Sequence, residues 1–236
     1  MVSLGDAIAL GEVVIPAVYN GLPVTAIADE GFIGCSNMTS IIIPNSITDI
    51  GANSLKGCTG LTSITIPFTG ASLNGTANTH FGYLFGAENS YNQKSLIPSS
   101  LETVIITGER LVSYAFRDCD LKYIYIEGMT VIGENAFYEC KLENVYIPEG
   151  VTVIGFAVFS DCMLINIYIP KSLEKIERSA FSRFINDGYN NYPKNVFYNG
   201  DIDAWEEIDI GAYNWALNRS SLDSATIYYN YDYDWY

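Results

Sequence analysis

Five cysteines are the residues whose type and spacing could most readily support chemistry. Each takes the last position of a short unit close to A-F-x-x-C, in the order Cys35, Cys58, Cys119, Cys140 and Cys162. Thiolates bind zinc or form disulfides, but zinc-binding cysteines usually come in pairs a few residues apart. Neighbouring cysteines here are at least 21 residues apart, and no paired histidine accompanies them. The spacing therefore does not predict a metal site.

Histidine and carboxylate side chains offer the other routes to catalysis. The only histidine, His80, has no G-x-S-x-G elbow beside it, and the chain has no H-E-x-x-H motif, phosphate-binding loop or dinucleotide fingerprint. We interpret His80 as a loop residue that packs near Phe81. Carboxylates gather at Asp201, Asp203, Glu206, Glu207 and Asp209, and two carboxylates suffice for glycoside hydrolysis. Nothing singles out a pair. We expect a solvated acidic face, with weak calcium binding as the alternative, and no catalytic residue or cofactor.

These side chains must be positioned by a unit that recurs along the chain. In the copy that begins at Leu142, Val145 and Ile147 complete a strand with an apolar inner side, Pro148 ends it, and a second apolar pattern follows. One copy buries too little apolar area to offset a backbone entropy cost of about 1 to 2 kcal/mol per ordered residue. The unit is therefore expected to be stable only when it is stacked between copies of itself.

Written loosely as L-x-x-I-x-I-P-x-x-V-T-x-I-G-x-x-A-F-x-x-C, the unit resembles the BspA-type leucine-rich repeat of bacterial surface and secreted proteins. The resemblance covers nearly the whole chain, through Ile43-Pro44, Ile66-Pro67, Ile147-Pro148 and Ile169-Pro170 at the strand ends and Ala115-Phe116, Ala136-Phe137 and Ala180-Phe181 on the other side. It implies a right-handed leucine-rich-repeat solenoid, α/β in class but dominated by strands. A parallel sheet would form its concave face, with short strands and helical turns opposite. It also implies adhesion or recognition rather than catalysis.

The repeats predict a single domain over residues 1–236. We expect an N-terminal cap over 1–14, repeats over 15–184, and the last strands with a C-terminal cap over 185–236, in which residues 203–217 form a helix or an irregular cap. A stretch rich in Gly, Asn, Ser and Thr interrupts the repeats at about 68–98 and contains HFGYLFG. Similar insertions occur in the resembled family. We interpret this one as a surface loop pinned by its aromatic side chains.

Equivalent side chains of neighbouring turns are expected to lie in columns, about 4.8 Å apart. Cysteines in one column have parallel Cβ vectors, and their number is odd, which argues against disulfides between them. We therefore interpret the five cysteines as a column of buried free thiols that act as small apolar side chains, with Phe184 in the next position. Metal binding is the weaker alternative.

The residue between the two isoleucines of each strand should face away from the core, since side chains alternate along a strand. This position holds Ile42, Thr65, Ile105, Tyr125, Tyr146, Tyr168 and, by extrapolation, Phe197 and Tyr228. The preceding outward position holds Ser40, Ser63, Thr103, Tyr123, Asn144 and Asn166. The candidate binding residues on the concave face are therefore Tyr123, Tyr125, Asn144, Tyr146, Asn166, Tyr168 and Phe197. Flat rings beside hydroxyl and amide groups suit a peptide or a sugar. Alternatively, the tyrosines only stack on their copies and stabilise the sheet.

The chain carries 12 basic and 27 acidic residues, a formal net charge of -15. This charge repels phosphate backbones and anionic lipid, so we expect no nucleic-acid partner. No segment approaches the roughly 18 consecutive apolar residues of a membrane span, so we expect no membrane insertion. The N-terminus has no basic residue before Lys56 and is not a signal peptide. The family resemblance nevertheless implies an extracellular or cell-surface location, with the export signal not present in this chain.

Three functions remain open at this stage. The first is a non-enzymatic binding or adhesion module that recognises a protein or a glycan through the solenoid surface. The second is a structural spacer segment of a larger cell-surface protein. The third is an enzyme that acts on glycans, and it depends on a carboxylate pair that the sequence does not identify.

Overall fold

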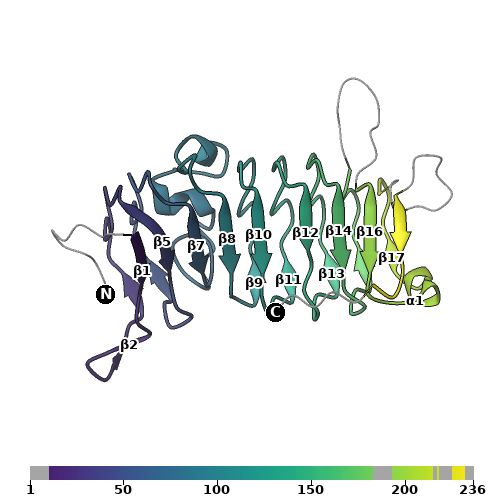
Figure 1. The fold of residues 1–236 in the computed structure, drawn as a ribbon, viewed down its shortest axis with the longest axis horizontal. Coiled ribbons are helices and arrows are strands. Elements are labelled where there is room, and N and C mark those ends of the chain that lie inside the picture. Colours follow the sequence, from purple (N-terminus) through teal and green to yellow (C-terminus); the bar gives the residue numbers. More distant parts are fainter. Residues whose placement is uncertain (1–10, 183–192, 215–216, 218–224, 232–236) are drawn as a thin grey trace.

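The structure is a computed structural model that describes residues 11–182, 193–214, 217 and 225–231. The chain winds through a series of similar turns, most of which contain a longer strand and then a short strand (Figure 1). The expected solenoid of parallel strands with few helices is confirmed. Residues 1–10 of the expected N-terminal cap, the cysteine-column position of Phe184 and the tail from residue 232 lie outside the described residues.

The longer strands form one face of the molecule, which we call the long-strand face. They make two parallel sheets, in the orders β1-β5-β7-β8-β10 and β12-β14-β16-β18. Side chains alternate between buried and accessible along them, as in β7, where Ile64 and Ile66 are buried. The bounds are β1 (Gly11–Val14), β5 (Met38–Ile42), β7 (Ser63–Ile66), β8 (Thr103–Ile106), β10 (Tyr123–Ile126), β12 (Asn144–Tyr146), β14 (Asn166–Ile169), β16 (Asn195–Tyr198) and β18 (Thr226–Tyr228).

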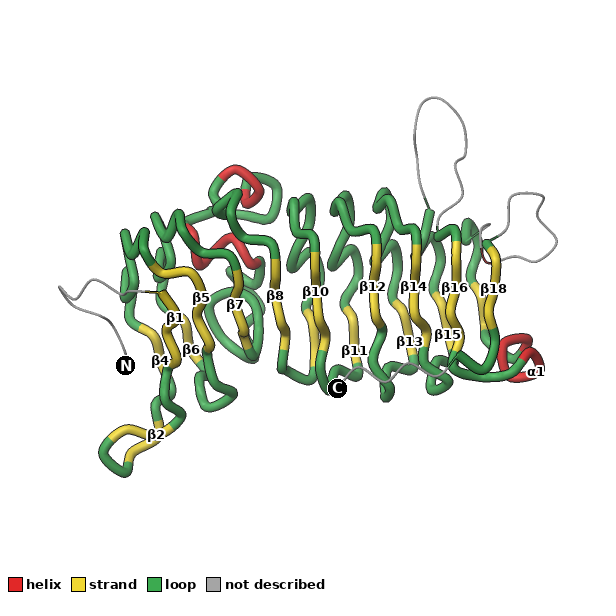
Figure 2. The backbone as a smooth tube through the Cα atoms, viewed as in Figure 1, coloured by secondary structure: helices red, strands yellow, loops and turns green. Residues whose placement is uncertain are grey.

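Short strands form a second layer, visible beside the longer strands in Figure 2. β4 (Ala26–Ile27) pairs with β6 (Asp49–Ile50), and a separate parallel sheet contains β9 (Arg110–Leu111), β11 (Val131–Ile132), β13 (Val153–Ile154), β15 (Lys175–Ile176) and β17 (Asp209–Ile210). The two layers are interrupted at different places. The long-strand face breaks between β10 and β12, where β11 still pairs with β13. The short-strand layer breaks between β6 and β9, where β5, β7 and β8 still pair.

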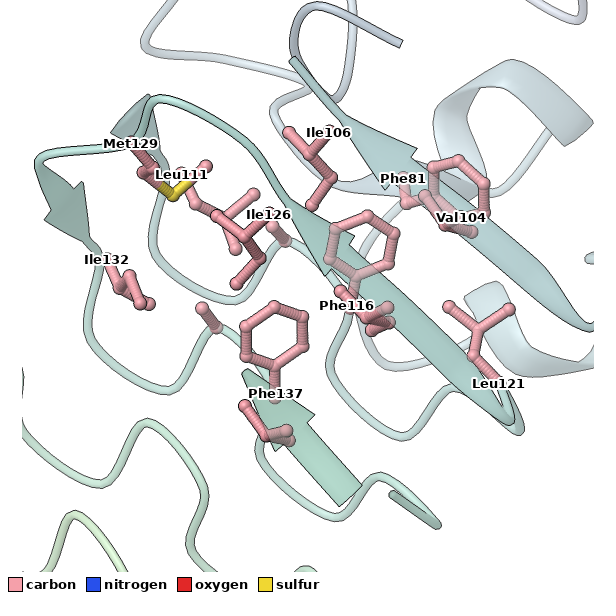
Figure 3. Close-up of a cluster of buried hydrophobic side chains, with 14 of the residues drawn as sticks. Phe81, Val104, Ile106, Leu111, Phe116, Leu121, Ile126, Met129, Ile132 and Phe137 are labelled. Carbon is pink, nitrogen blue, oxygen red and sulfur yellow. The ribbon is translucent and has the colours of Figure 1, made fainter. Parts of the chain in front are cut away.

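Buried phenylalanines form a column through the core, one in each successive turn. Phe81, Phe116, Phe137, Phe159 and Phe181 follow one another with ring centroids 4.8, 5.6, 5.3 and 5.5 Å apart. The last three contacts are stacked, with interplanar angles of 11°, 4° and 12°. Figure 3 shows the start of this column, with Phe81, Phe116 and Phe137 among branched side chains of the strands. One ring per turn is the packing that the repeat pattern requires.

The insertion is built into the core of its turn. Its first 3-10 helix, η1 (Phe81–Phe85), begins with the ring that joins the phenylalanine column, and the Phe81 amide donates to the Ala115 carbonyl at 2.9 Å. A second 3-10 helix, η2 (Gln93–Ser95), contributes Gln93, which is fully buried. The Gln93 side chain accepts from the Gly82 amide at 2.9 Å and donates to the Arg117 carbonyl at 2.8 Å. Aromatic side chains do pin the insertion, but a buried amide also ties it to the next turn.

Two small elements depart from the repeat pattern. β2 (Val18–Tyr19) and β3 (Leu22–Pro23) form an antiparallel hairpin, whose turn residues Asn20 and Gly21 have φ of 49° and 77°, as a tight hairpin turn requires. The helix α1 (Ile202–Glu206) lies in the expected C-terminal cap. The same region supplies the strand β17, which was not predicted from the sequence although Asp209-Ile210-Gly211 repeats the Asp49-Ile50-Gly51 of an earlier turn. Its Ile210 is in register with Ile176 of the preceding short strand.

Candidate functional site

Aromatic residues predicted to face away from the core lie in one line on the long-strand face. The strand register places Tyr146 beside Tyr168, Tyr168 beside Phe197 and Phe197 beside Tyr228. Successive ring centroids are 4.0, 4.7 and 4.8 Å apart, with interplanar angles of 20°, 13° and 10°. We call these four residues the aromatic stripe. It crosses β12, β14, β16 and β18.

Stacking determines which part of each ring a ligand can reach. Rings at these distances and angles cover one another's faces, so ring edges and hydroxyl groups are the accessible parts. Burial and a hydrogen bond with Tyr168 raise the pKa of Tyr146 above its usual value. The phenol of Tyr146 therefore stays protonated and neutral at physiological pH. The stripe offers edges and hydroxyl groups, rather than the flat ring faces considered from the sequence.

Asparagine side chains form a hydrogen-bonded column beside the stripe. Asn166 Nδ2 donates to Asn144 Oδ1 at 2.7 Å, and Asn195 Nδ2 donates to Asn166 Oδ1 at 2.8 Å. We call these three residues the asparagine column. Thr226 is next in register. Asn144 and Asn166 were predicted from the sequence and Asn195 was not, although Asn195 takes the same position before V-F-Y as its counterparts do in their strands.

The remaining two predicted binding residues lie on the other sheet of the long-strand face. Tyr123 and Tyr125 belong to β10, in register with Thr103 and Ile105 of β8. Their exposed fractions are 49% and 39%. Because the face is interrupted between β10 and β12, these two tyrosines do not belong to the ladder that carries the stripe. The seven predicted residues thus lie on two ladders, two on β10 and five on the other: Asn144, Tyr146, Asn166, Tyr168 and Phe197. The strands β10 and β12 are still neighbours, and Tyr125 contributes to the raised pKa of Tyr146.

One further ring, which the sequence analysis did not consider, lies against the stripe. The centroid of the Tyr231 ring is 4.7 Å from that of Phe197 and 5.9 Å from that of Tyr168, with interplanar angles of 52° and 50°. The Tyr231 amide donates to the Tyr198 carbonyl at 3.1 Å, which brings the chain back over the last strands. The stripe therefore accommodates an aromatic side chain from outside its own sheet.

The five cysteines are all free thiols. Cys58, Cys119, Cys140 and Cys162 are buried, whereas Cys35, the first of the column, is only partly buried and departs from the expectation. The thiols of Cys140 and Cys162 donate to the carbonyls of Phe116 and Phe137 at 2.9 and 3.0 Å. Burial raises the pKa of Cys58 to about 11 and that of Cys140 to about 12. This disfavours the thiolate form that a nucleophile or a metal ligand requires.

His80 and the acidic residues considered for catalysis have structural or solvated environments. His80 is 6% exposed, and its Nε2 lies 3.0 Å from the Ala87 carbonyl oxygen. Burial lowers its pKa, so the ring is neutral. Asp201 caps α1 by accepting from the Ala204 amide at 2.9 Å, and Asp203 and Glu207 are exposed. Within the described ranges, no three His, Cys, Asp or Glu side chains gather where they could hold a metal ion.

The repeat architecture also identifies the family. The family model of the BspA type Leucine rich repeat region matches in 6 copies, over residues 21–84 and 109–210. The chain belongs to the BspA-type leucine-rich repeat family. The matched ranges leave out residues 85–108, which include the second part of the insertion.

Three solved structures are similar to this BspA-type protein, and two of them are leucine-rich repeat proteins by name. One from T. pallidum is 20% identical over 91% of this chain and 86% of its own, with a TM-score of 0.41. One from Bacteroides ovatus is 19% identical over 92% and 63%, with a TM-score of 0.33. A leucine rich cell surface protein from Faecalibacterium prausnitzii is 15% identical over 84% and 90%, with a TM-score of 0.27. No curated protein sequence matches the chain.

Across the part of the chain that the structure describes, no helix has the length and apolar character needed to cross a bilayer.

Proposed function

We propose that this BspA-type protein is a non-enzymatic recognition module that binds an extended protein or glycan segment along the long-strand face. One observation carries the proposal: the aromatic stripe crosses β12, β14, β16 and β18, and the asparagine column runs beside it across β12, β14 and β16. Together they offer ring edges, phenol hydroxyls and amides at one strand spacing, about 4.8 Å. An extended ligand laid across the strands would meet a similar set of groups at every step.

The position of Tyr231 supports binding at this face. Its ring packs against Phe197 and Tyr168 without belonging to the sheet. Tyrosine buries much contact area at a low cost in conformational entropy, which makes it a frequent residue of binding surfaces. A ligand with an aromatic or apolar group would use the contact that Tyr231 already makes, or extend it toward Tyr146.

A structural spacer is the second candidate, and a specific observation favours it. The stripe rings stack on one another, and the amides of the asparagine column bond to one another. Stacked and mutually bonded side chains stabilise a sheet whether or not a ligand binds, by about 0.2 to 1 kcal/mol per cross-strand pair. In that case the face would be accessible but would have no partner.

Binding measurements on matched variants distinguish the two candidates. The native chain is screened against immobilised extracellular-matrix proteins and a glycan array, together with the double variant Tyr146→Ser/Tyr168→Ser and the control Tyr19→Ser. Tyr19 is 67% exposed on the β2–β3 hairpin, away from the stripe. We expect binding by the native chain and the control, and its loss in the double variant. Equal binding by all three, or no binding by any, would leave the spacer as the function.

A location at the bacterial cell surface is part of the same proposal. It is supported by the resemblance of the repeats to those of bacterial surface and secreted proteins. Immunolabelling of intact cells that express the native gene tests the proposal. Labelling that appears only after the cells are permeabilised would contradict it.

A further inference from the structure

A hollow lies away from the long-strand face, over the turns that follow the short strands, and one column of equivalent residues runs through it. The turns that follow β9, β11, β13, β15 and β17 each contain a residue with positive φ at the equivalent position: Tyr114 (60°), Asn135 (54°), Ala157 (51°), Ser179 (60°) and Tyr213 (66°). Backbone hydrogen bonds between neighbouring turns confirm the equivalence. The amide of each of these residues donates to the carbonyl of the residue just before the equivalent position in the next turn: Tyr114 to Glu134, Asn135 to Phe156, Ala157 to Arg178 and Ser179 to Ala212. The three middle side chains are small, and tyrosines stand at both ends.

The small side chains leave a hollow of about 340 Å³, which we call the turn-side hollow. Its lining residues are Tyr114, Asn135, Ala157 and Ser179 from the column, Phe156 and Arg178 from the preceding position, and Arg117, Tyr138 and Ser160 from the position three residues later. This volume is at the lower end of the range of small-molecule sites, about 300 to 1,000 Å³. It suits one sugar ring or a group of similar size.

Two buried polar side chains in this hollow make no hydrogen bond within the described structure. Asn135 is 8% exposed and Ser179 is 5% exposed, and the side chain of neither one bonds to a residue that the structure describes. Neighbouring Ser160, by contrast, is paired with Ser182 at 3.0 Å. The polar atoms of Asn135 and Ser179 are not among the fully buried side-chain atoms that lack a partner, so they are reached from the hollow. The amide and the hydroxyl are therefore available to a ligand's hydroxyl groups.

Two arginines line the hollow in a chain with 12 basic and 27 acidic residues, and the carboxylates nearest to its lining are Glu139, paired with Arg117, and Asp161, hydrogen-bonded to Tyr138. The Arg117 guanidinium lies 4.2 and 5.0 Å from the ring centroids of Tyr91 and Tyr138, and it forms an ion pair with Glu139 at 3.2 Å. The Arg178 guanidinium lies 4.8 Å from the Tyr213 centroid and has no ion pair with any described residue. The aromatic rings hold both guanidinium groups in place, and Arg178 retains its full charge for an anion.

We infer that the turn-side hollow binds a carboxylated sugar unit of an acidic glycan. The single charge of a carboxylate matches the one guanidinium without an ionic partner, and arginine binds carboxylates through two parallel hydrogen bonds. The rings of Tyr114, Tyr138 and Phe156 provide apolar walls for the C–H groups of the sugar. Asn135 and Ser179 provide its hydroxyl partners. This site lies apart from the aromatic stripe and does not depend on the function proposed for the long-strand face.

The test is a calorimetric titration of the full chain with methyl glucuronide, and with methyl glucoside as the neutral probe. Arg178→Gln removes the guanidinium that has no ion pair among the described residues but keeps a polar side chain, and Asn135→Asp adds a carboxylate without changing the side chain's size. Lys171→Gln is the control, since Lys171 is exposed, does not line the hollow, and its loss changes the net charge equally. Circular dichroism checks that each variant is folded.

We expect the native chain and Lys171→Gln to bind the glucuronide equally well, and both hollow variants to bind it at least about tenfold more weakly. Arg178→Gln loses a charge-assisted hydrogen bond, and Asn135→Asp places a second carboxylate beside that of the ligand. Methyl glucoside should bind at least about tenfold more weakly than the glucuronide, for the same reason. Equal binding of the two sugars, unchanged binding in both hollow variants, or no glucuronide binding would overturn the inference. A tighter interaction with an acetylated peptide carrying a free C-terminal carboxylate would also overturn it, because the ligand would then be a protein terminus.

Discussion

Replacing Phe137 with alanine should reduce the free energy of unfolding by about 4 kcal/mol. The Phe137 ring is fully buried and lies between Phe116, at 5.6 Å, and Phe159, at 5.3 Å. Removing a buried phenylalanine ring costs about 3 to 5 kcal/mol, through lost apolar transfer and the cavity that remains. The two lost ring contacts are worth about 0.5 to 1.5 kcal/mol each, which favours the upper half of that range.

The cavity should not close, because both neighbouring turns are held by backbone bonds. The Phe116 amide donates to the Ala136 carbonyl at 2.8 Å, and the Phe137 amide donates to the Val158 carbonyl at 3.0 Å. These bonds fix the spacing of the turns, so Phe116 and Phe159 cannot move together to fill the space. The loss is a large part of the roughly 5 to 15 kcal/mol that stabilises most folded proteins.

Urea unfolding followed by far-ultraviolet circular dichroism measures this effect. The control is Val131→Ala, in the same turn, where the side chain is 53% exposed and the expected change is within about 0.5 kcal/mol. Phe137→Leu retains most of the apolar volume and should fall between the two. If Phe137→Ala lowered the free energy of unfolding no more than Val131→Ala does, the phenylalanine column would not be what stabilises the stack.

Three further outcomes follow from the structure. Asn166→Ala removes both hydrogen bonds of the asparagine column and should lower the free energy of unfolding, measured by thermal unfolding, by about 1 to 3 kcal/mol. Asn144→Ala removes one of these bonds and should lower it less. Equal decreases in the two variants would contradict the column. Ellman's reagent with mass mapping should label Cys35 first and the other thiols only after denaturation, and rapid labelling of several native thiols would refute their burial. Burial lowers the folded-state pKa of His80 below its ordinary value of 6.5, so the unfolded chain takes up the proton first as the pH falls. The stability that neutral His80 contributes to the folded chain is therefore lost as the pH falls below about 6.5. The difference in melting temperature between the native chain and His80→Gln should therefore shrink from about pH 7.5 to pH 5, and a constant difference would show that His80 does not titrate on unfolding.

Sequence reasoning succeeded where every turn places the same residue in the same environment. Buried strand positions such as Ile64 and Val104, and the phenylalanines at Phe116 and Phe137, repeat because each must fit against an almost identical neighbour. Alternation along a strand then determines which side chains face outward, as with Tyr146 and the other residues of the stripe. A periodic pattern therefore predicts both the fold and the columns.

Features that occur only once in the chain could not be predicted in this way. Gln93 bridges the insertion and the next turn, and no periodic signal in the sequence points to that contact. Alternation gives the side of the sheet but not the side-chain rotamer, so the stacking of Tyr168 on Tyr146 needed coordinates. The turn-side hollow depends on which residues happen to be small at Asn135, Ala157 and Ser179. The hollow arises where the repeats differ from one another, and a pattern that the repeats share does not predict such differences.

The staggered interruptions of the two strand layers affect how the protein would respond to tension along its length. Hydrogen bonds between parallel strands run along the long axis of a solenoid, so pulling on its ends would stretch them. At the interruption between β10 and β12 the force would pass through the bonds of β11 and β13 and through turn bonds such as that from Phe137 to Val158. At the interruption between β6 and β9 it would pass through those of β7 and β8 and through the bond from Phe81 to Ala115. The insertion is therefore not a place where the turns would separate first. A surface protein built from this array would extend only when hydrogen bonds between paired strands break.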